Sequence, residues 1–430
     1  MINRLHLSTA HILDASFLWI SGICLFFVMA MPDGYSAIKT IAFILLFGFT
    51  LLECVVQKYT FKTLNLYATV IFVLYFSLSL LYGIHNGYSF SSQDFGLARM
   101  FLMNPICSLL IGTGLTLHKR GQYLPGLLVY LGCAICVLNL GIILNGRGVI
   151  PNFYVLQFFE IKNNSIYETG LFLRISNEPA LMFLLPYMIV SLAHIKSHPL
   201  SVKICLFVGV AVGCIDTLLS GRKSLELVVG LSSAVFLIQS LRRFSIKTFV
   251  KNVLWWSITS VAFILGVKFI SQKFAILNIF FSAYQTMSLG LSSAHTGRLS
   301  RTENIHYLIN GWLENPITFF IGHGLNSYAP ESIASWTSKW SYEVFYHALL
   351  YQAGLIGLGL LLGAYYLLIR PAAKVYFAKY DTTALACIIS SLCFMFTSAT
   401  NPMIASVWFW IFLWAFYFQY RQLNRKINED

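Results

Sequence analysis

The residues best suited to chemistry in this chain are arginines and one histidine that lie beside its long apolar runs. In the segment 220–224, Ser-Gly-Arg-Lys-Ser, Arg222 and Lys223 stand together between two apolar stretches. A guanidinium offers a planar fork of donors that matches a phosphate group. The segment therefore indicates an anion site, although contact with lipid headgroups or a pair with Glu226, four residues on, would explain the same charges.

The segment 170–179, Gly-Leu-Phe-Leu-Arg-Ile-Ser-Asn-Glu-Pro, precedes another apolar run. Arg174 is a second candidate for anion binding, and Glu178 stands four residues after it, so the two side chains have the spacing of an ion pair. Ser176 or Asn177 is expected to cap the following helix, because Pro179 suits a first turn.

The segment 295–301, His-Thr-Gly-Arg-Leu-Ser-Arg, supplies Arg298 and Arg301. It leads into residues 301–313, where apolar side chains recur at spacings of three and four and predict an amphipathic helix. This helix is expected to lie on the membrane surface or to cap a helical bundle.

Two histidines follow. His323 lies in Gly-His-Gly-Leu-Asn-Ser-Tyr, residues 322–328, which lacks the Lys-Ser/Thr of a phosphate loop and is better explained as a turn that ends at Tyr328. His347 lies at the start of a long apolar run. An imidazole there suits proton transfer at neutral pH, and a histidine satisfied by water or a helix carbonyl is the alternative.

The composition determines which elements must position these residues. The 430 residues are 57% hydrophobic and only 10% charged, with a mean hydropathy of +0.72. A soluble domain has about 25% charged residues, so soluble, disordered and coiled-coil classes are excluded. Apolar runs of about 20 residues, enough to cross a bilayer, lie near 15–31, 37–56, 64–84, 98–117, 123–144, 177–194, 200–219, 224–241, 250–269, 344–369, 382–400 and 403–420.

The chain is therefore predicted to be an all-α polytopic membrane protein, a single transmembrane domain over 1–430 with about twelve helices. Placing both termini in the cytoplasm puts most of the 29 lysines and arginines in short cytoplasmic loops, as the positive-inside rule requires. The net charge of +13 then reflects topology and not nucleic-acid binding. The first run is expected to be retained as a helix. All nine cysteines fall inside predicted spans, so neither a disulfide framework nor a metal site is indicated.

Two outward connections are long, 145–177 and 270–342, and the second precedes the tenth predicted span. The second is rich in tryptophan and tyrosine, which argues against a disordered linker. Aromatic faces suit sugar rings and arginines suit phosphate, so a phosphate-linked glycan is the substrate class that would use both.

In their order and membrane placement, these segments resemble the O-antigen polymerase and O-antigen ligase superfamily. The stretch 297–357, from its Gly-Arg pair to its Gly-Leu-Ile-Gly run, is similar to the ligase-like region of that family. The turn 220–222 is similar to its second arginine site, and residues 174–179 are similar to the polymerase version of its first outward loop.

The resemblance implies that Arg222 and one loop arginine hold the pyrophosphate of a polyprenyl-linked donor, with His347 as the catalytic group near the acceptor hydroxyl. The spacing back from Pro316 favours Arg301 as the loop arginine, whereas the Gly-Arg pair favours Arg298. Further candidates for substrate contact are Arg174, Lys223, Glu178, His323 and Tyr328.

The implied activity is that of an O-antigen polymerase, a metal-independent glycosyltransferase without a cofactor in the bacterial inner membrane. It would join polyprenyl-pyrophosphate-linked repeat units at the periplasmic face and release polyprenyl pyrophosphate. A ligase that transfers the chain to lipid A core, a transporter of the lipid-linked oligosaccharide and a scaffold for other assembly enzymes are the alternatives. Expected partners are the lipid-linked glycan, membrane lipid, and a chain-length regulator and flippase of the same pathway.

Overall fold

The computed structural model describes residues 2–32, 36–56, 58–59, 63–90, 94–118, 120–146, 150, 166–169, 172–175, 177–220, 222–243, 301–330, 342–400 and 406–429. The predicted span 250–269 and most of the connection 145–177 lie outside these ranges.

Apart from one two-stranded hairpin, every regular element in the described ranges is helical. The first half contains α1 (Ile2–Ala30), α2 (Ser36–Val56), α3 (Thr63–His85), α4 (Phe95–Ala98), the π-helical turn η2 (Arg99–Met103), α5 (Asn104–Gly114), the 3-10 turn η3 (Arg120–Tyr123) and α6 (Leu124–Gly146). The hairpin β1 (Ile166–Thr169) and β2 (Phe172–Ile175) follows.

The second half contains α8 (Glu178–Ser191), the 3-10 turn η5 (Leu192–Ser197), α9 (Leu200–Ser220), α10 (Lys223–Arg243), α13 (Arg301–Trp312), α14 (Pro316–Ile321), α15 (Phe345–Lys379), α16 (Thr382–Thr397), the 3-10 turn η6 (Ser398–Thr400) and α17 (Val407–Glu429). The helical class predicted from composition is confirmed, and the hairpin is an addition to it.

Eight helical stretches of the described chain are long and apolar enough to cross a membrane, and each coincides with one of the twelve predicted spans. The predicted spans near 15–31 and 382–400 are also helical, but their apolar stretches, Asp14–Ala30 and Thr382–Thr397, are shorter. The span near 403–420 coincides with α17. The chain is therefore membrane-embedded.

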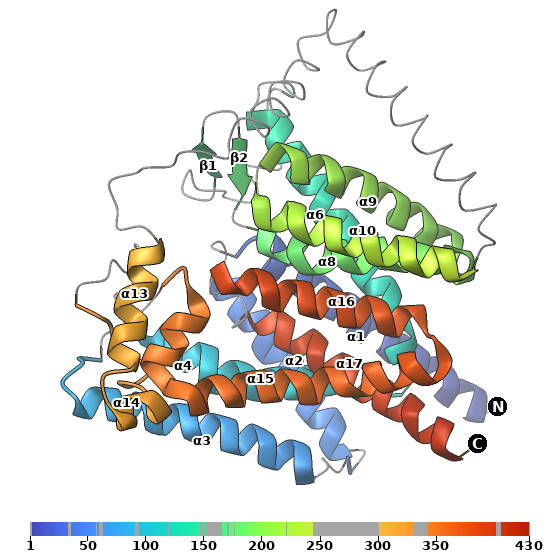
Figure 1. Cartoon of the computed structure of the whole chain (residues 1–430). Coiled ribbons are helices and arrows are strands. Elements are labelled where there is room, and N and C mark those ends of the chain that lie inside the picture. Colours follow the sequence, from blue (N-terminus) through green and yellow to red (C-terminus); the bar gives the residue numbers. More distant parts are fainter. Residues whose placement is uncertain are drawn as a thin grey trace, which may run out of the picture.

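The helices form one bundle in which the start of α1 and the end of α17 lie at the same end (Figure 1). We call this the terminal end. The opposite end, on the left of Figure 1, holds the hairpin, α13, α14 and the first turns of α8, α10 and α15. We call it the distal end. Helices that cross a bilayer back and forth would produce this segregation.

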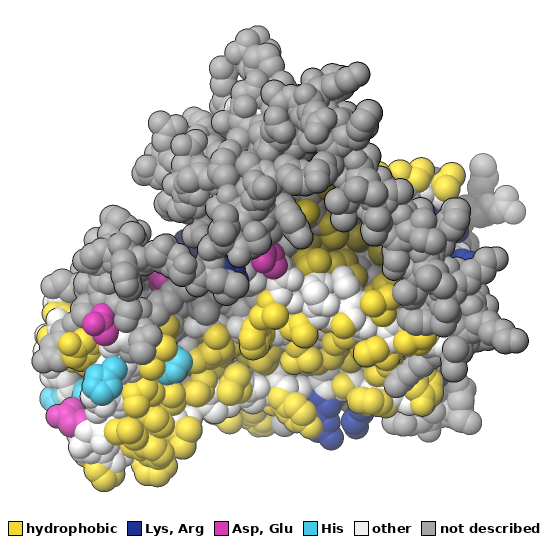
Figure 2. All heavy atoms as spheres, turned by 45° about the horizontal axis from the view of Figure 1, so that its top comes forward, with side chains coloured by type: hydrophobic (Ala, Val, Ile, Leu, Met, Phe, Trp, Pro, Cys, Tyr) yellow, Lys and Arg dark blue, Asp and Glu magenta, His cyan; other side chains and the backbone are white. Residues whose placement is uncertain are grey.

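On the face shown in Figure 2, hydrophobic side chains form a broad band along the bundle, and the histidines and most of the visible acidic side chains lie at the end that holds α13 and α14. Several of the apolar side chains are largely exposed, including Trp19, Val56 and Leu200. In water, exposing these side chains would cost free energy. In a bilayer they contact lipid tails, which are as apolar as the side chains themselves.

The centre of the bundle is α8. Every residue from Ala180 to Ser191 is buried, and the helix packs against α6, α9, α10 and α16. A helix that is apolar all round is expected to be buried all round. Phe183 lies among the rings of Phe394, Trp408 and Phe412. This rigid centre fixes the position of the Glu178 turn at its distal end.

The terminal end is held by one buried guanidinium. Arg120, only 2% exposed, donates from Nε to Asp14 of α1 at 2.6 Å and from both terminal nitrogens to Glu53 of α2 at 2.7 and 2.8 Å. The ring of Phe17 lies 4.3 Å from its guanidinium carbon. Arg120 therefore joins the first two helices to the α5–α6 connection.

His118 lies in the same cluster, with Nε2 3.1 Å from Glu53. Asp14, Glu53 and His118 have the spacing of metal ligands. However, the Arg120 guanidinium already bonds both carboxylates, so the positive charge that a metal would supply is present. The cluster is a structural clamp.

α15 is interrupted one-third of the way along, at Gly354, where φ is +63° and ψ is −170°. The interruption releases three helix carbonyls. Those of Tyr351 and Gln352 accept from the amides of His323 and Gly324, both at 2.9 Å, and that of Ala353 accepts from the hydroxyl of Tyr75. The glycine-rich segment 322–324 therefore docks on the broken turn of α15.

Gly354→Ala is expected to lower the free energy of unfolding by about 1–3 kcal/mol, because only glycine tolerates this backbone conformation. A Cβ at this position would also lie 2.3 Å from the carbonyl oxygen of Phe320. The matched control is Gly359→Ala on the same helix, where no atom lies within 4 Å of the added Cβ. Thermal unfolding in detergent should show a loss for the first variant and none for the second; equal effects would contradict this.

Arg120→Gln is expected to destabilise the protein by roughly 3 kcal/mol, because two carboxylates lose their shared cation. Arg99→Gln, at an exposed arginine, should change stability by less than about 0.5 kcal/mol. Unfolding of both variants in mixed micelles tests the clamp. An Arg120 variant as stable as the Arg99 variant would show that the buried network contributes nothing.

Candidate functional site

The distal end brings together most of the elements predicted to carry functional residues. β2 packs against α6 and α9, and α13 and α14 pack against α15. The first turns of α8, α10 and α15 lie at this end as well (Figure 1). Segments separated by more than 100 positions in the sequence thus share one end of the bundle.

The site begins where the hairpin enters α8. The strands pair antiparallel, with Tyr167 opposite Arg174 and Ile166 opposite Ile175. The amide of Ile175 donates to Oε1 of Glu178 at 2.9 Å. The predicted cap at Asn177 is wrong: its side chain makes no cap hydrogen bond, and Nδ2 donates instead to the carbonyl of Ala30 at 3.0 Å. Asn177 therefore fixes this corner to the end of α1.

Glu178 forms an ion pair with Arg222. The carboxylate is 2% exposed, and its Oε2 contacts Nε of Arg222, whose side chain is 17% exposed. The predicted alternative in which Arg222 pairs with Glu226 is wrong, because the guanidinium reaches across to α8. The other pairing expected from spacing, Glu178 with Arg174, lies outside the described atoms, because the side chain of Arg174 is not among them.

The geometry of this pair leaves one side of the guanidinium available. The carboxylate contacts Nε, whereas the two terminal nitrogens of Arg222 make no hydrogen bond within the described part of the chain. Glu178 is itself fixed by the Ile175 amide. An arginine that is held through Nε presents its terminal fork in a fixed direction, which is the arrangement that binds a phosphate bidentately.

Asp216, one turn before the end of α9, is a buried acid close to this pair that we did not predict as part of the site. It is 2% exposed, and neither carboxylate oxygen has a hydrogen-bond partner among the described residues. The carboxylate of Glu178 lies close enough to repel it. The sequence did contain a signal, because Asp216 is an acidic residue inside an apolar run. Burying a charge in a membrane costs free energy, so such a residue is taken as a functional candidate by default.

The remainder of the distal end is an aromatic cap. α13 begins at Arg301 and forms the amphipathic helix predicted from spacing; its Leu308 is fully buried against Ala348 and Tyr351 of α15. Trp312 stacks on Phe319 with ring centroids 4.9 Å apart. The helix therefore packs on the start of α15 at the end of the bundle.

His323 and Tyr328 belong to the packing of this cap. The His323 ring stacks on Tyr351 at 4.4 Å, and its Nε2 lies 3.0 Å from the carbonyl oxygen of Gly311. The Tyr328 ring meets that of Tyr88 edge-on at 5.4 Å. The interpretation of residues 322–324 as a turn is supported, because the amides of His323 and Gly324 bond α15 and are not available to a phosphate.

His347 lies in the first turn of α15, half-buried, and its Nδ1 has no hydrogen-bond partner among the described residues. Lys223 is exposed at the first position of α10. Arg298 lies outside the described residues, and for Arg301 only the backbone is described. The structure thus joins Arg222 to Glu178 directly, and it places Lys223, Arg301, His323, Tyr328 and His347 at the same end.

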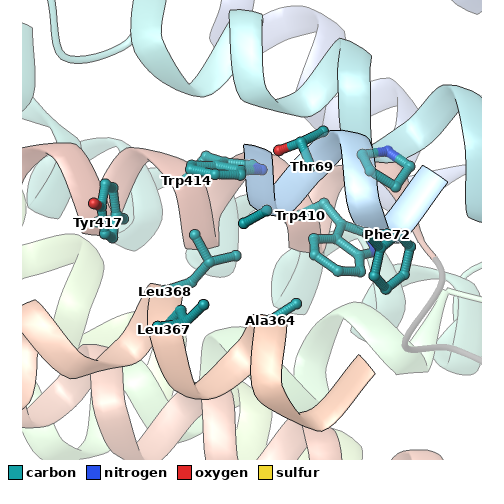
Figure 3. A pocket seen from close by; sticks show the side chains of 10 residues that line it. Thr69, Phe72, Ala364, Leu367, Leu368, Trp410, Trp414 and Tyr417 are labelled. Atoms are coloured by element: carbon teal, nitrogen blue, oxygen red, sulfur yellow. The ribbon is translucent and has the colours of Figure 1, made fainter. Parts of the chain in front are cut away.

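A separate hollow of about 60 Å³ lies between α3, α5, α15 and α17. Its walls include Phe72, Ala364, Leu368, Trp410 and Trp414 (Figure 3). No side chain that is charged at neutral pH lines it, so it does not suit phosphate chemistry.

A double-mutant cycle tests the ion pair. Glu178→Gln and Arg222→Gln together should be less destabilising than the sum of the two single changes, with a coupling energy of about 1–3 kcal/mol, because each single change strands a buried charge. The same cycle with Glu226→Gln and Arg222→Gln should be additive within about 0.5 kcal/mol. Coupling to Glu226 and none to Glu178, measured by unfolding in mixed micelles, would contradict the observed pairing.

Comparisons with known proteins add no assignment to this geometry. No protein-family model matches the chain, and no curated protein matches it. What the distal end does must therefore be argued from its residues.

Proposed function

We propose that the chain is an O-antigen polymerase, a membrane glycosyltransferase that joins polyprenyl-pyrophosphate-linked repeat units at its distal end. The observation that carries the proposal is the Arg222 guanidinium, held through Nε by buried Glu178 and open at its terminal nitrogens. A cation fixed in this way at one end of an apolar bundle suits a diphosphate whose lipid tail remains in the bilayer.

The proposed reaction needs a stabilised leaving group. A hydroxyl oxygen of one repeat unit attacks the anomeric carbon of a lipid-linked chain, and the bond from that carbon to the phosphate oxygen breaks. The electron pair leaves with polyprenyl pyrophosphate. Arg222 would hold the phosphate oxygens on which negative charge develops, and a fixed donor costs no reorganisation at that moment. A loop arginine, Arg298 or Arg301, would supply the second cation.

The hydroxyl must also lose a proton. His347 is the proposed base, because it lies in the distal turn of α15 and its buried Nδ1 is not engaged by another described residue. A positioned base contributes about 10²–10⁴-fold to such a step. The aromatic cap on α13 and α14 would give sugar rings apolar faces beside the charged groups.

A polymerase is preferred to a ligase because the corner that anchors Arg222 is the Asn-Glu-Pro segment, which resembles the polymerase version of the family loop. Its Glu178 orients the arginine and its Asn177 ties the corner to α1. A transporter would place ionisable groups along a path through the bilayer. In the described residues, the two buried ion-pair networks lie at opposite ends of the bundle and do not form such a path.

The experiment is a lipopolysaccharide gel of a deletion strain that expresses each variant. Arg222→Ala is expected to abolish the polymer ladder and leave one repeat unit on the core, because losing one fixed donor costs about 10²–10³-fold in rate. Arg222→Lys should be intermediate, since the charge remains and the Nε contact with Glu178 is lost.

The control is Arg99→Ala, at an exposed arginine outside the ion pair, which should leave the ladder unchanged at equal membrane levels. A normal ladder in Arg222→Ala would refute the assignment. Polymer stranded on its lipid carrier, with no repeat unit on the core, would identify a ligase instead.

A further inference from the structure

Two polar side chains inside the bundle have no use in the proposed reaction. Asp216 of α9 and Asn139 of α6 are 2% and 1% exposed. Neither oxygen of Asp216, and neither the oxygen nor the nitrogen of the Asn139 amide, has a hydrogen-bond partner among the described residues. Buried polar groups are normally paired, so each exception calls for an explanation.

The atoms that surround two glycines, one in α6 and one in α9, show that the side chains of Asn139 and Asp216 face the same helix, α8. A Cβ on Gly132 of α6 would lie 2.8 Å from Sδ of Met188, and a Cβ on Gly209 of α9 would lie 2.9 Å from the same atom. Asn139 and Asp216 each follow one of these glycines by seven residues. Seven residues are almost two full turns, so each side chain lies on the same face as its glycine, about 10 Å further along.

From Gly132 to Asn139 in α6, and from Gly209 to Asp216 in α9, the chain advances in the same direction along the bundle. Gly209 approaches Cys133, and Gly213 approaches Cys136, so α6 and α9 run in parallel. Gly213 also approaches Leu185 of α8, whereas Gly209 approaches Met188, so α8 runs in the opposite direction. Asn139 and Asp216 therefore meet over the distal turns of α8, beneath the Glu178–Arg222 pair.

Among the described residues, the charges at this level do not balance. Arg222 neutralises Glu178, which leaves the charge of Asp216 without a described counterion. An uncompensated carboxylate inside an apolar bundle costs several kcal/mol. Water can supply hydrogen bonds but not the charge. A proton also removes the charge, and the measurements below distinguish a proton from a metal cation.

We propose that Asp216 and Asn139 form a buried site for a small monovalent cation, with sodium as its ion. The two carboxylate oxygens and the amide oxygen are hard donors of the kind that bind group-one and group-two cations. One positive charge completes the balance, which disfavours a divalent ion. The cation joins α6 to α9 below Arg222, so it acts on the fold and goes beyond the proposed reaction.

The test measures thermal unfolding of the purified full chain in detergent, with sodium chloride titrated against choline chloride at constant ionic strength. For the wild type, the unfolding temperature should rise with sodium and then saturate. Asp216→Asn, which keeps the shape of the side chain, should abolish the dependence, and Asn139→Leu should shift its midpoint to at least tenfold higher sodium. Binding of radioactive sodium to the wild type, reduced in both variants, is the second measurement.

The matched control is Glu226→Gln, which removes an acidic group from the first turn of α10 and should keep the full sodium response. A wild type that responds equally to sodium and choline overturns the proposal. So does a stability that follows pH alone, which would assign a proton to Asp216. None of these measurements reads glycan synthesis. A negative result therefore refutes the sodium site without refuting the proposed polymerase activity, and a negative result in the polymerase experiment does not refute the sodium site.

Discussion

The ion pair between Glu178 and Arg222 is the contact on which the distal end depends. It joins the hairpin, the central helix α8 and the start of α10, because Glu178 also accepts the amide of Ile175. Neither charge would be tolerable alone in an apolar bundle. The pairing through Nε offsets the cost of burying the two charges. It also fixes the direction of the remaining N–H donors of Arg222. The Arg120 clamp applies the same rule at the terminal end, where all three guanidinium nitrogens donate to other residues of the chain.

The helices could be predicted because length and hydropathy are local properties. Eight predicted spans coincide with membrane-length helices, and the amphipathic segment that follows Arg301 is α13, with its periodic Leu308 buried. The turn at residues 322–324 was also predictable, since its two glycines adopt φ of +75° and +109°. The candidate site was found at the level of segments: Arg222 and Glu178 were both identified, and the structure brings them together.

Their partnership could not be predicted, because nearby positions offered equally good partners. Spacing alone matched Glu178 to Arg174 and Arg222 to Glu226, each four residues away. The long-range pairing follows from how α8, α9 and α10 pack, which no periodicity encodes. Asn177 was misassigned for the same reason, since the carbonyl it bonds lies at the end of α1, 147 positions earlier. The hairpin strands are only four residues long, too short for a clear alternating pattern.

The order in which the Arg120 clamp is made along the chain has a consequence for biogenesis. Asp14 and Glu53 both leave the ribosome before Arg120 is synthesised. The first two helices therefore cannot make these contacts until the α5–α6 connection emerges. The clamp is completed by a residue that lies 67 positions beyond the second acid.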